Sequence, residues 1–259
     1  MPFLDRSDAR IYYESKGQGD AIVFAHGAGG NAAIWFNQIA AFSGAYSTLV
    51  FDHRCFGRSL CNVDLTVTDF RDDLLGILDA LNIERAHLVG QSMGGFTCLR
   101  TALDMPARVI SLTLSCTSGG IYNPEPTDAL RNLTASDDRA TSGVLKTMSR
   151  SSSEQIHLMQ LYESINNFNT EFSWGRLSTL LGPEEVVDLG QLKEVQCPTL
   201  FISGAEDPLF PPDQLSQYVP HFNNAKIEVV ENAGHSPYFE QPTVFNGLLL
   251  KHIGAVTQN

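Results

Sequence analysis

The sequence predicts an α/β fold in which a mostly parallel β-sheet carries helices on both of its faces. Two observations support this class. Six short apolar runs recur along the 259 residues, rich in β-branched residues and without alternation of polar and apolar positions, which is typical of strands covered on both faces. Segments with apolar residues at helical spacing lie between these runs. Strands and helices should therefore alternate along the chain.

The strands and helices can be located individually. A first stretch, residues 9–13, alternates polar and apolar positions and suits a strand at the edge of the sheet. We predict buried strands at residues 21–25, 48–51, 87–89, 109–114, 199–202 and 227–230. We predict helices at residues 70–81, 93–103 and 244–253, where apolar side chains form stripes.

The alternation stops between residues 120 and 195, where no buried-strand run occurs. The S-x-x-E sequence at residues 151–154 predicts a capping box, and apolar residues then follow at helical spacing. An insertion of about 70 residues is too long for a plain connection. We therefore expect a helical cap, or lid, at 120–195, on a core domain formed by 1–119 and 196–259. A few extra packing helices are the alternative interpretation.

The charge balance limits the partners of the chain. It has 29 acidic and 17 basic residues, a net charge of −12, so phosphate backbones and anionic lipid surfaces would repel it. We expect a small-molecule substrate, no nucleic-acid partner and no membrane association. No run of 18 apolar residues and no basic, then apolar, start occurs. Neither a membrane span nor a signal peptide is therefore predicted.

The five cysteines, Cys55, Cys61, Cys98, Cys116 and Cys197, are scattered and include no C-x-x-C pair. An odd number of scattered cysteines argues against a disulfide scaffold and against a zinc site. We therefore expect a reducing, cytoplasmic setting. The sequence favours neither a monomer nor a homodimer.

One motif points to nucleophilic catalysis. The third buried run leads into Gly90-Gln91-Ser92-Met93-Gly94, a G-x-S-x-G sequence between a predicted strand and a predicted helix. Such a turn is tight enough to strain the serine backbone, and the two glycines leave room for it. The Ser92 hydroxyl should be lifted above the strand ends, at the positive end of the following helix. We expect Ser92 to be the nucleophile.

A serine nucleophile requires a base, and the sequence offers seven histidines. These are His26, His53, His87, His157, His221, His235 and His252. His235 follows the last buried run and is the preferred base. His87 opens a buried strand and is expected to be structural, whereas His157 and His252 lie on helical segments and are expected to face solvent.

An acid should orient the base. The strand predicted at 199–202 runs into a polar loop that contains Glu206 and Asp207. Asp207 is the preferred acid, although an Asp-Pro pair standing alone would be read as a turn. The chain order Ser92, Asp207, His235 is the order expected for a triad in this architecture.

A glycine-rich loop follows the first buried run. Its sequence, His26-Gly27-Ala28-Gly29, lets backbone N–H groups approach a reacting oxygen. We expect the N–H groups of Ala28 and Met93 to form an oxyanion hole. The loop lacks the lysine and the spacing of a phosphate-binding loop.

These motifs together resemble the α/β-hydrolase fold family. The resemblance rests on five stretches in the family's order, and it covers nearly the whole chain: residues 26–29, 52–59, 90–94, 204–207 and 234–235. It implies an eight-stranded, mostly parallel sheet with a helical cap inserted after the sixth strand. It also implies that Ser92, Asp207 and His235 are nucleophile, acid and base.

Two positions depart from the family's pattern. Cys55 stands where the D-x-R-G-x-G-x-S stretch usually has glycine, so the backbone there should differ and Cys55 could touch the pocket. Gln91 stands before the nucleophile, where many esterases carry histidine or leucine. Its amide could contact the substrate or pack under the turn.

The residues predict a serine hydrolase that cleaves a carboxylic ester or a lactone through an acyl-enzyme, with no metal or cofactor. The same triad could serve a cofactor-free perhydrolase or haloperoxidase-like enzyme, or a carbon–carbon bond hydrolase or lyase. The residues after His235 differ from the GHWAQWE stretch of carbon–carbon bond hydrolases. A small-ligand receptor is the non-enzymatic alternative, and the intact triad counts against it.

The cap composition favours a small, largely apolar substrate. The candidate substrate-binding residues are His26, Gly27, Gln91, Met148, Met159 and Trp174. Arg54 and Arg58, near the strand ends, could bind one carboxylate, but ion pairs within their loop are the preferred interpretation.

Overall fold

The computed structural model describes residues 2–62, 64–122, 146–170, 177, 179–180, 182 and 185–257. In this part of the chain a single nine-stranded sheet has the order β1-β2-β4-β3-β6-β7-β8-β9, with β5 paired to β2. The strands are β1 Phe3–Asp5, β2 Ala9–Lys16, β3 Ala21–Ala25, β4 Ser47–Phe51, β5 Leu60–Cys61, β6 Ala86–Gln91, β7 Val109–Ser115, β8 Thr199–Gly204 and β9 Ala225–Val230. The predicted α/β class is confirmed.

The direction of the strands also follows the expectation. Neighbours from β4 through β3, β6, β7 and β8 to β9 are parallel, whereas β2 runs antiparallel to β1, β4 and β5. The edge position predicted for residues 9–13 is wrong, because β2 has a neighbour on each side and β1 forms the edge. β1 has only three residues, too few for an apolar pattern to reveal it.

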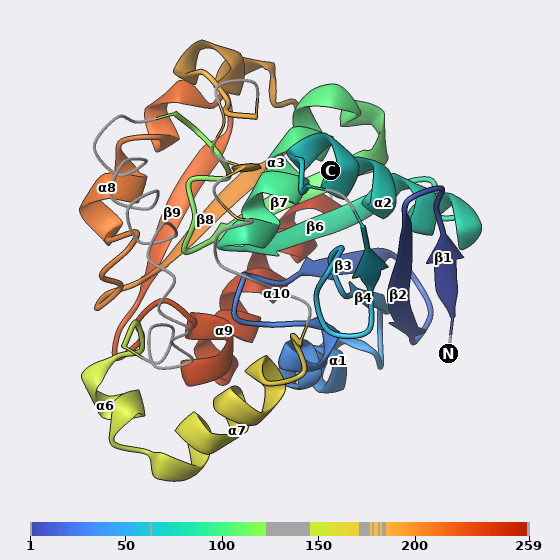
Figure 1. Ribbon diagram of the computed structural model, residues 1–259. Helices are drawn as coiled ribbons and strands as arrows, with labels where there is room; N and C mark the ends of the chain where they lie inside the picture. The colour runs from blue at the N-terminus through green and yellow to red at the C-terminus, as the bar shows by residue number, and fades with distance from the viewer. Residues whose placement is uncertain are drawn as a thin grey trace.

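Helices cover both faces of the sheet, with α2 and α3 on one face and α1 and α10 on the other (Figure 1). The α-helices are α1 Phe36–Phe42, α2 Val67–Ala80, α3 Met93–Asp104, α6 Arg150–Ser153, α7 Ile156–Asn166, α8 Pro212–Ser216, α9 Pro237–Glu240 and α10 Pro242–Thr257. Short 3₁₀ helices are η1 Ala32–Trp35, η2 Pro106–Arg108, η4 Leu189–Glu194 and η5 Val219–His221. None of the described helices combines the length and the apolar character needed to cross a membrane.

The strand β3 shows why its sequence lacks polar alternation. Ile22 and Phe24 pack in a core cluster with Trp35 and other residues of the α1 and α10 face. Val23 packs in a second cluster with Leu74 of α2, on the opposite face. Because both faces are covered, every position of this strand must be apolar.

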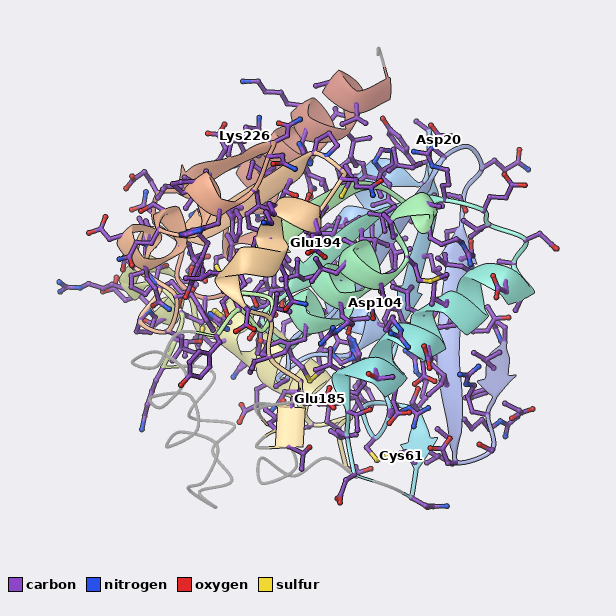
Figure 2. All side chains as sticks on the ribbon, turned by 90° about the horizontal axis from the view of Figure 1, so that it is seen from above. Asp20, Cys61, Asp104, Glu185, Glu194 and Lys226 are labelled. Atoms are coloured by element: carbon purple, nitrogen blue, oxygen red, sulfur yellow. A yellow bond between two sulfur atoms is a disulfide. The ribbon has the colours of Figure 1, made fainter. Side chains whose placement is uncertain are left out.

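The inserted region leaves and re-enters the core at one place. Ile121 and Val187 form an isolated parallel bridge, and the N–H of Tyr122 donates to Val187 O at 2.8 Å. Glu185, labelled in Figure 2, accepts a hydrogen bond from the N–H of Val67 at 2.7 Å, at the first turn of α2. These contacts hold residues 185–187 against Tyr122 and the start of α2.

Within the region predicted to be a cap, the described α-helices are α6 and α7, which lie beside α9 and α1 (Figure 1). Tyr162 and Ile165 of α7 are buried, and the Tyr162 ring meets that of Phe239 edge-on at 5.1 Å. The capping box predicted at residues 151–154 is wrong. Ser149 is the N-cap of α6, because its side chain already accepts from the N–H of Ser152.

A disulfide joins Cys55, in the loop after β4, to Cys61 of β5, which is labelled in Figure 2. Cys55 has a φ of 62°, the left-handed conformation that explains why related loops use glycine there. The loop turns back and brings the two Cα atoms to 5.3 Å, a proximity that scattered cysteines in a sequence do not reveal. One pair is not a scaffold, but the cysteines no longer support a reducing setting.

Candidate active site

The three residues of the predicted triad come from neighbouring strand ends. Ser92 follows β6, Asp207 lies three residues beyond β8, and His235 lies in the loop between β9 and α9. Since β6 to β9 are parallel, their carboxyl ends share one edge of the sheet. Ligands of open α/β sheets bind at that edge.

The backbone of Ser92 is strained, as the motif predicts. Its φ is 49° and its ψ is −117°, a region that non-glycine residues enter only when the surrounding structure holds them there. A Cβ on Gly90 would lie 2.5 Å from Gly94 O, and a Cβ on Gly94 would overlap the carbonyl oxygen of Ala25. The two glycines are therefore required for the close packing of the turn.

Hydrogen bonds tie the strained turn to β7 and to the residues that follow β7. The N–H of Ser92 donates to Ser115 O at 3.0 Å, and the hydroxyl of Thr117 donates to Ser92 O at 2.7 Å. Ser92 is partly exposed, whereas its neighbours in the chain are buried. α3 begins at Met93, so the amide dipoles of a twelve-residue helix point their positive end toward Ser92.

His235 and Asp207 form a buried pair. His235 Nδ1 lies 3.0 Å from Asp207 Oδ2 and 3.1 Å from Oδ1. The N–H groups of Leu209 and Phe210 donate to Asp207 Oδ1 at 2.9 and 3.2 Å. Burial raises the pKa of Asp207, but His235 and these two amides outweigh it and hold that pKa below its ordinary value. The carboxylate is thus charged and oriented toward the imidazole.

The predicted oxyanion loop lies beside the nucleophile. A Cβ on Gly27 would be 3.0 Å from Ser92 Cβ, so the loop passes directly against the turn. The N–H of Gly30 donates to Gly27 O at 2.9 Å and closes a tight turn around Ala28. Ala28 and Met93 pack in one small cluster. The structure therefore brings the two residues of the expected oxyanion hole together.

His26, at the start of this loop, is fully buried and holds the loop by hydrogen bonds. Its Nδ1 lies 2.7 Å from Gly27 O, and its Nε2 accepts from the backbone N–H of His53 at 2.9 Å. Burial lowers the pKa of His26 to about 4, so the ring is neutral at neutral pH. His53 is likewise buried, and its Nε2 lies 2.9 Å from Thr97 Oγ1. Both histidines have structural partners, whereas His235 is hydrogen-bonded to Asp207.

The remaining predicted substrate-binding residues have different surroundings. Gln91 is buried, and its Nε2 donates to His235 O at 2.9 Å, so it links the turn to the histidine loop. Met148 is buried, and Met159 packs against the same core cluster. Trp174 lies outside the described residues.

Neither arginine near the site is free. Arg54 is buried and pairs with Asp73, its Nε 2.6 Å from Asp73 Oδ2. Arg58 lies 3.0 Å from Asp52 Oδ2 through its Nε. Loop ion pairing, the preferred interpretation of both side chains, is thus confirmed for Arg58, whereas Arg54 forms its buried ion pair with α2.

Two residues near the triad escaped the sequence analysis. Cys116 is buried with a φ of 49°, and its thiol, a carboxylate oxygen of Asp207 and a ring nitrogen of His235 lie within 4.8 Å of one another. A cation there would have to displace the direct hydrogen bond between Asp207 and His235. Glu240 is buried and accepts hydrogen bonds around His235. Its place five residues after His235, where the GHWAQWE stretch also has glutamate, could have drawn attention to it.

Comparison with known proteins places the chain in a family. A 2-hydroxy-6-oxononadienedioate/2-hydroxy-6-oxononatrienedioate hydrolase of Burkholderia vietnamiensis is 30% identical over 280 residues, covering 96% of this chain and 92% of the relative. A 3-oxoadipate enol-lactonase of Acinetobacter baylyi is 28% identical over 228 residues, covering 87% and 85%. The solved structure of Est816, described as an N-acyl homoserine lactone degrading enzyme, is 27% identical with a TM-score of 0.81, covering 96% and 98%. The model of the alpha/beta hydrolase family matches residues 22–248, and the chain is an enzyme of this family.

Proposed function

We propose that this enzyme is a serine hydrolase that cleaves a carboxylic ester or a lactone of a small, largely apolar substrate. The observation that carries the proposal is that a strained, partly exposed Ser92 and the buried His235–Asp207 pair follow parallel strands ending at one sheet edge. Gln91, which directly precedes Ser92, donates a hydrogen bond to His235 O. Nucleophile, base and acid are the parts of a serine triad, which is recognised by geometry rather than by chain position.

In the first half of the proposed reaction, Ser92 Oγ attacks the carbonyl carbon while His235 takes its proton. Asp207 holds the tautomer of His235 through Nδ1 and stabilises the imidazolium that forms. The negative charge that develops on the carbonyl oxygen is accepted by the N–H groups of Ala28 and Met93, each of which contributes roughly 3 kcal/mol in comparable sites. His235 then gives its proton to the leaving alkoxide, and an acyl-enzyme remains.

In the second half, His235 removes a proton from water, and the resulting hydroxide attacks the acyl carbon. The second tetrahedral intermediate collapses, His235 returns a proton to Ser92 Oγ, and the carboxylic acid leaves. A lactone follows the same course, except that its alkoxide stays attached to the acyl group and leaves with it.

We also propose that residues 120–195 act as a cap that covers the site. The described part of this region touches the catalytic loop directly, because the N–H of His235 donates to Thr147 O at 2.8 Å. Met159 of α7 packs against the core cluster that contains the buried Met148, which favours an apolar lining near the substrate. Among relatives, the Acinetobacter baylyi protein is named an enol-lactonase, and Est816 degrades a lactone according to its description.

Carbon–carbon bond hydrolysis is the second candidate. It is favoured by the relative from Burkholderia vietnamiensis, whose named substrate contains no ester or lactone bond. The stretch Ser236-Pro237-Tyr238 differs from the GHWAQWE pattern noted above, which favours the ester or lactone reading.

Steady-state hydrolysis of p-nitrophenyl esters from acetate to decanoate, wild type beside Ser92→Ala, tests the proposal. Multiple turnovers that vanish in Ser92→Ala support a serine hydrolase, and the chain-length profile measures the pocket. Folded wild-type protein that releases no more nitrophenol than Ser92→Ala contradicts the esterase reading. A lactone, a 2-hydroxy-6-oxo-dienoate and hydrogen peroxide with an acyl donor then separate lactonase, carbon–carbon hydrolase and perhydrolase activity.

A further inference from the structure

Glu240 holds the backbone on both sides of His235. It lies in α9 and is only 6% exposed. Its Oε1 accepts from the N–H of Gly234 at 2.9 Å and from the N–H of Ser236 at 3.0 Å. These two residues directly precede and follow His235. A single carboxylate oxygen therefore fixes the peptide units that flank the histidine.

The other oxygen of Glu240 reaches the inserted region. Oε2 accepts from the N–H of Ser149 at 2.8 Å, and the N–H of His235 donates to Thr147 O at 2.8 Å. The two segments are in direct backbone contact, because a Cβ on Gly234 would overlap Thr147 O and lie 2.6 Å from Ser149 N. Glu240 thus joins the histidine loop to residues 147–149.

The remaining backbone polar group of His235, its carbonyl oxygen, is also hydrogen-bonded. This oxygen accepts from Gln91 Nε2 at 2.9 Å, and Gln91 directly precedes Ser92. The backbone of His235 is therefore fixed relative to the nucleophile on one side and to residues 147–149 on the other. The imidazole can turn only about its own side-chain bonds, and its hydrogen bond to Asp207 restricts that motion.

A buried carboxylate is costly unless it is fully hydrogen-bonded. An apolar side chain would fill the place of Glu240 at lower cost if packing were the only requirement. We propose that Glu240 is a positioning residue that aligns His235 with Ser92, an inference that rests on the proposed triad. It acts through the backbone at Gly234 and Ser236 and touches no reacting atom.

Substitution of Glu240 separates alignment from packing. In Glu240→Gln one acceptor oxygen becomes an amide NH₂ group, which is a donor. This donor must face either the N–H of Ser149 or the N–H groups of Gly234 and Ser236, which are donors themselves. Glu240→Ala removes both acceptors. Since a misplacement of about 1 Å costs about 100-fold in rate, we expect kcat to fall about 10-fold in Glu240→Gln and about 100-fold in Glu240→Ala, with KM changed less than about twofold.

Glu206→Gln is the matched control. Glu206 Oε2 accepts from the N–H of Arg150 at 2.8 Å at the surface, so this carboxylate also contacts the inserted region but not the flanks of His235. We expect its kcat to stay within about twofold of wild type. Equal losses in Glu206→Gln and Glu240→Gln would overturn the proposal, because contact with the insertion alone would then explain them.

A spectroscopic readout keeps the test independent of turnover. The Nδ1–H proton of His235, hydrogen-bonded to Asp207, should give a low-field proton resonance that His235→Ala removes. We expect this resonance in wild type and Glu206→Gln, and its broadening or loss in Glu240→Ala and Glu240→Gln. An unchanged resonance together with a kcat within about twofold of wild type in folded Glu240→Gln contradicts the positioning role. A third outcome is an inactive wild type in which the resonance is present in wild type and Glu206→Gln and is broadened or lost in both Glu240 variants. That outcome would refute the proposed function and leave the positioning role standing.

Discussion

At the scale of single residues, the turn at Ser92 depends on glycines, which have no side chain. Gly94 lies at the start of α3, where a Cβ would overlap Ala25 O and lie 2.9 Å from His26 O. Both obstacles are backbone atoms of the strand end and of the oxyanion loop, so neither can turn away as a flexible side chain would. Ser92 and the loop at residues 26–29 therefore keep their spacing only while this position is glycine.

We predict that Gly94→Ala destabilises the protein by about 1–3 kcal/mol and lowers kcat/KM, since the overlap must separate β3 from the turn. Gly247→Ala is the matched control, because a Cβ at Gly247, within α10, meets nothing within 4 Å. There the same substitution should stabilise by up to about 1 kcal/mol, the helix preference of alanine over glycine. Urea unfolding and ester hydrolysis measure both variants. Equal free energies of unfolding in the two variants would contradict this account.

The residues that sequence could and could not predict differ in a physical way. Ser92, Asp207 and His235 follow strand ends, and strand ends can be read from apolar runs. Glu240 could not be assigned, because its three partners are backbone N–H groups that only the folded loops bring together. His252 is expected to face solvent but is 4% exposed, because it lies three residues after Leu249, on the buried face of the C-terminal helix.

At the scale of elements, the end of α7 is fixed to the loops that carry the site. Asn31 Nδ2 donates to Ile165 O at 2.8 Å. The Asn169 side chain donates to Gly30 O at 3.1 Å and accepts from the N–H of Gly57 at 2.9 Å. The insertion thus contacts the oxyanion loop and the disulfide-bearing loop as well as the histidine loop. Movement of α7 would therefore displace the loops at Gly30 and Gly57.

The packing of α7 should be visible in its stability. We predict that Ile165→Ala lowers the free energy of unfolding by about 2–4 kcal/mol, because this side chain is buried. Leu161→Ala, four residues earlier on the same helix and 41% exposed, should change it by less than about 0.5 kcal/mol. Denaturant titration of both variants checks this. A larger loss in Leu161→Ala would mean that a different face of α7 is buried.

Strands and helices could be predicted from the sequence where all residues of the element are buried alike. The buried strand β3 matches its apolar run residue for residue. β6 extends beyond its predicted run at both ends, and β9, predicted to be buried, is buried only at Val230. The three-residue β1 was missed, and the start of α6 was misplaced by a competing serine cap. Short elements depend on hydrogen bonds made after folding, so their sequence carries little signal of its own.

At the scale of the whole molecule, several histidines are buried as neutral groups. Burial lowers the pKa of His26, His87 and His252 to about 4 and that of His53 well below its ordinary value. Each remains neutral in the folded protein at pH values where the unfolded chain binds a proton. The stability they contribute is therefore fully present above about pH 6.5 and is lost as the pH falls toward 4.

We predict that the free energy of unfolding drops between pH 7 and pH 5.5 by about 1 kcal/mol for each of these histidines. Urea titrations at the two pH values measure the sum. In His87→Gln, which keeps a polar group beside Ser111, the difference between the two pH values should shrink by about 1 kcal/mol. Identical unfolding free energies at both pH values in wild type would show that these rings are not buried as neutral groups.

The central claim is that Ser92 is the nucleophile and that His235 activates it. The most direct measurement is intact-protein mass spectrometry with peptide mapping after exposure to a p-nitrophenyl alkylphosphonate. Attack by Ser92 Oγ on phosphorus expels p-nitrophenolate and leaves a stable phosphonyl-serine that resembles the tetrahedral intermediate. The account predicts one phosphonyl group per chain, on Ser92, with ester hydrolysis lost in proportion and labelling strongly slowed in His235→Ala. Label on another residue, or complete labelling of Ser92 with hydrolysis unchanged, would contradict it.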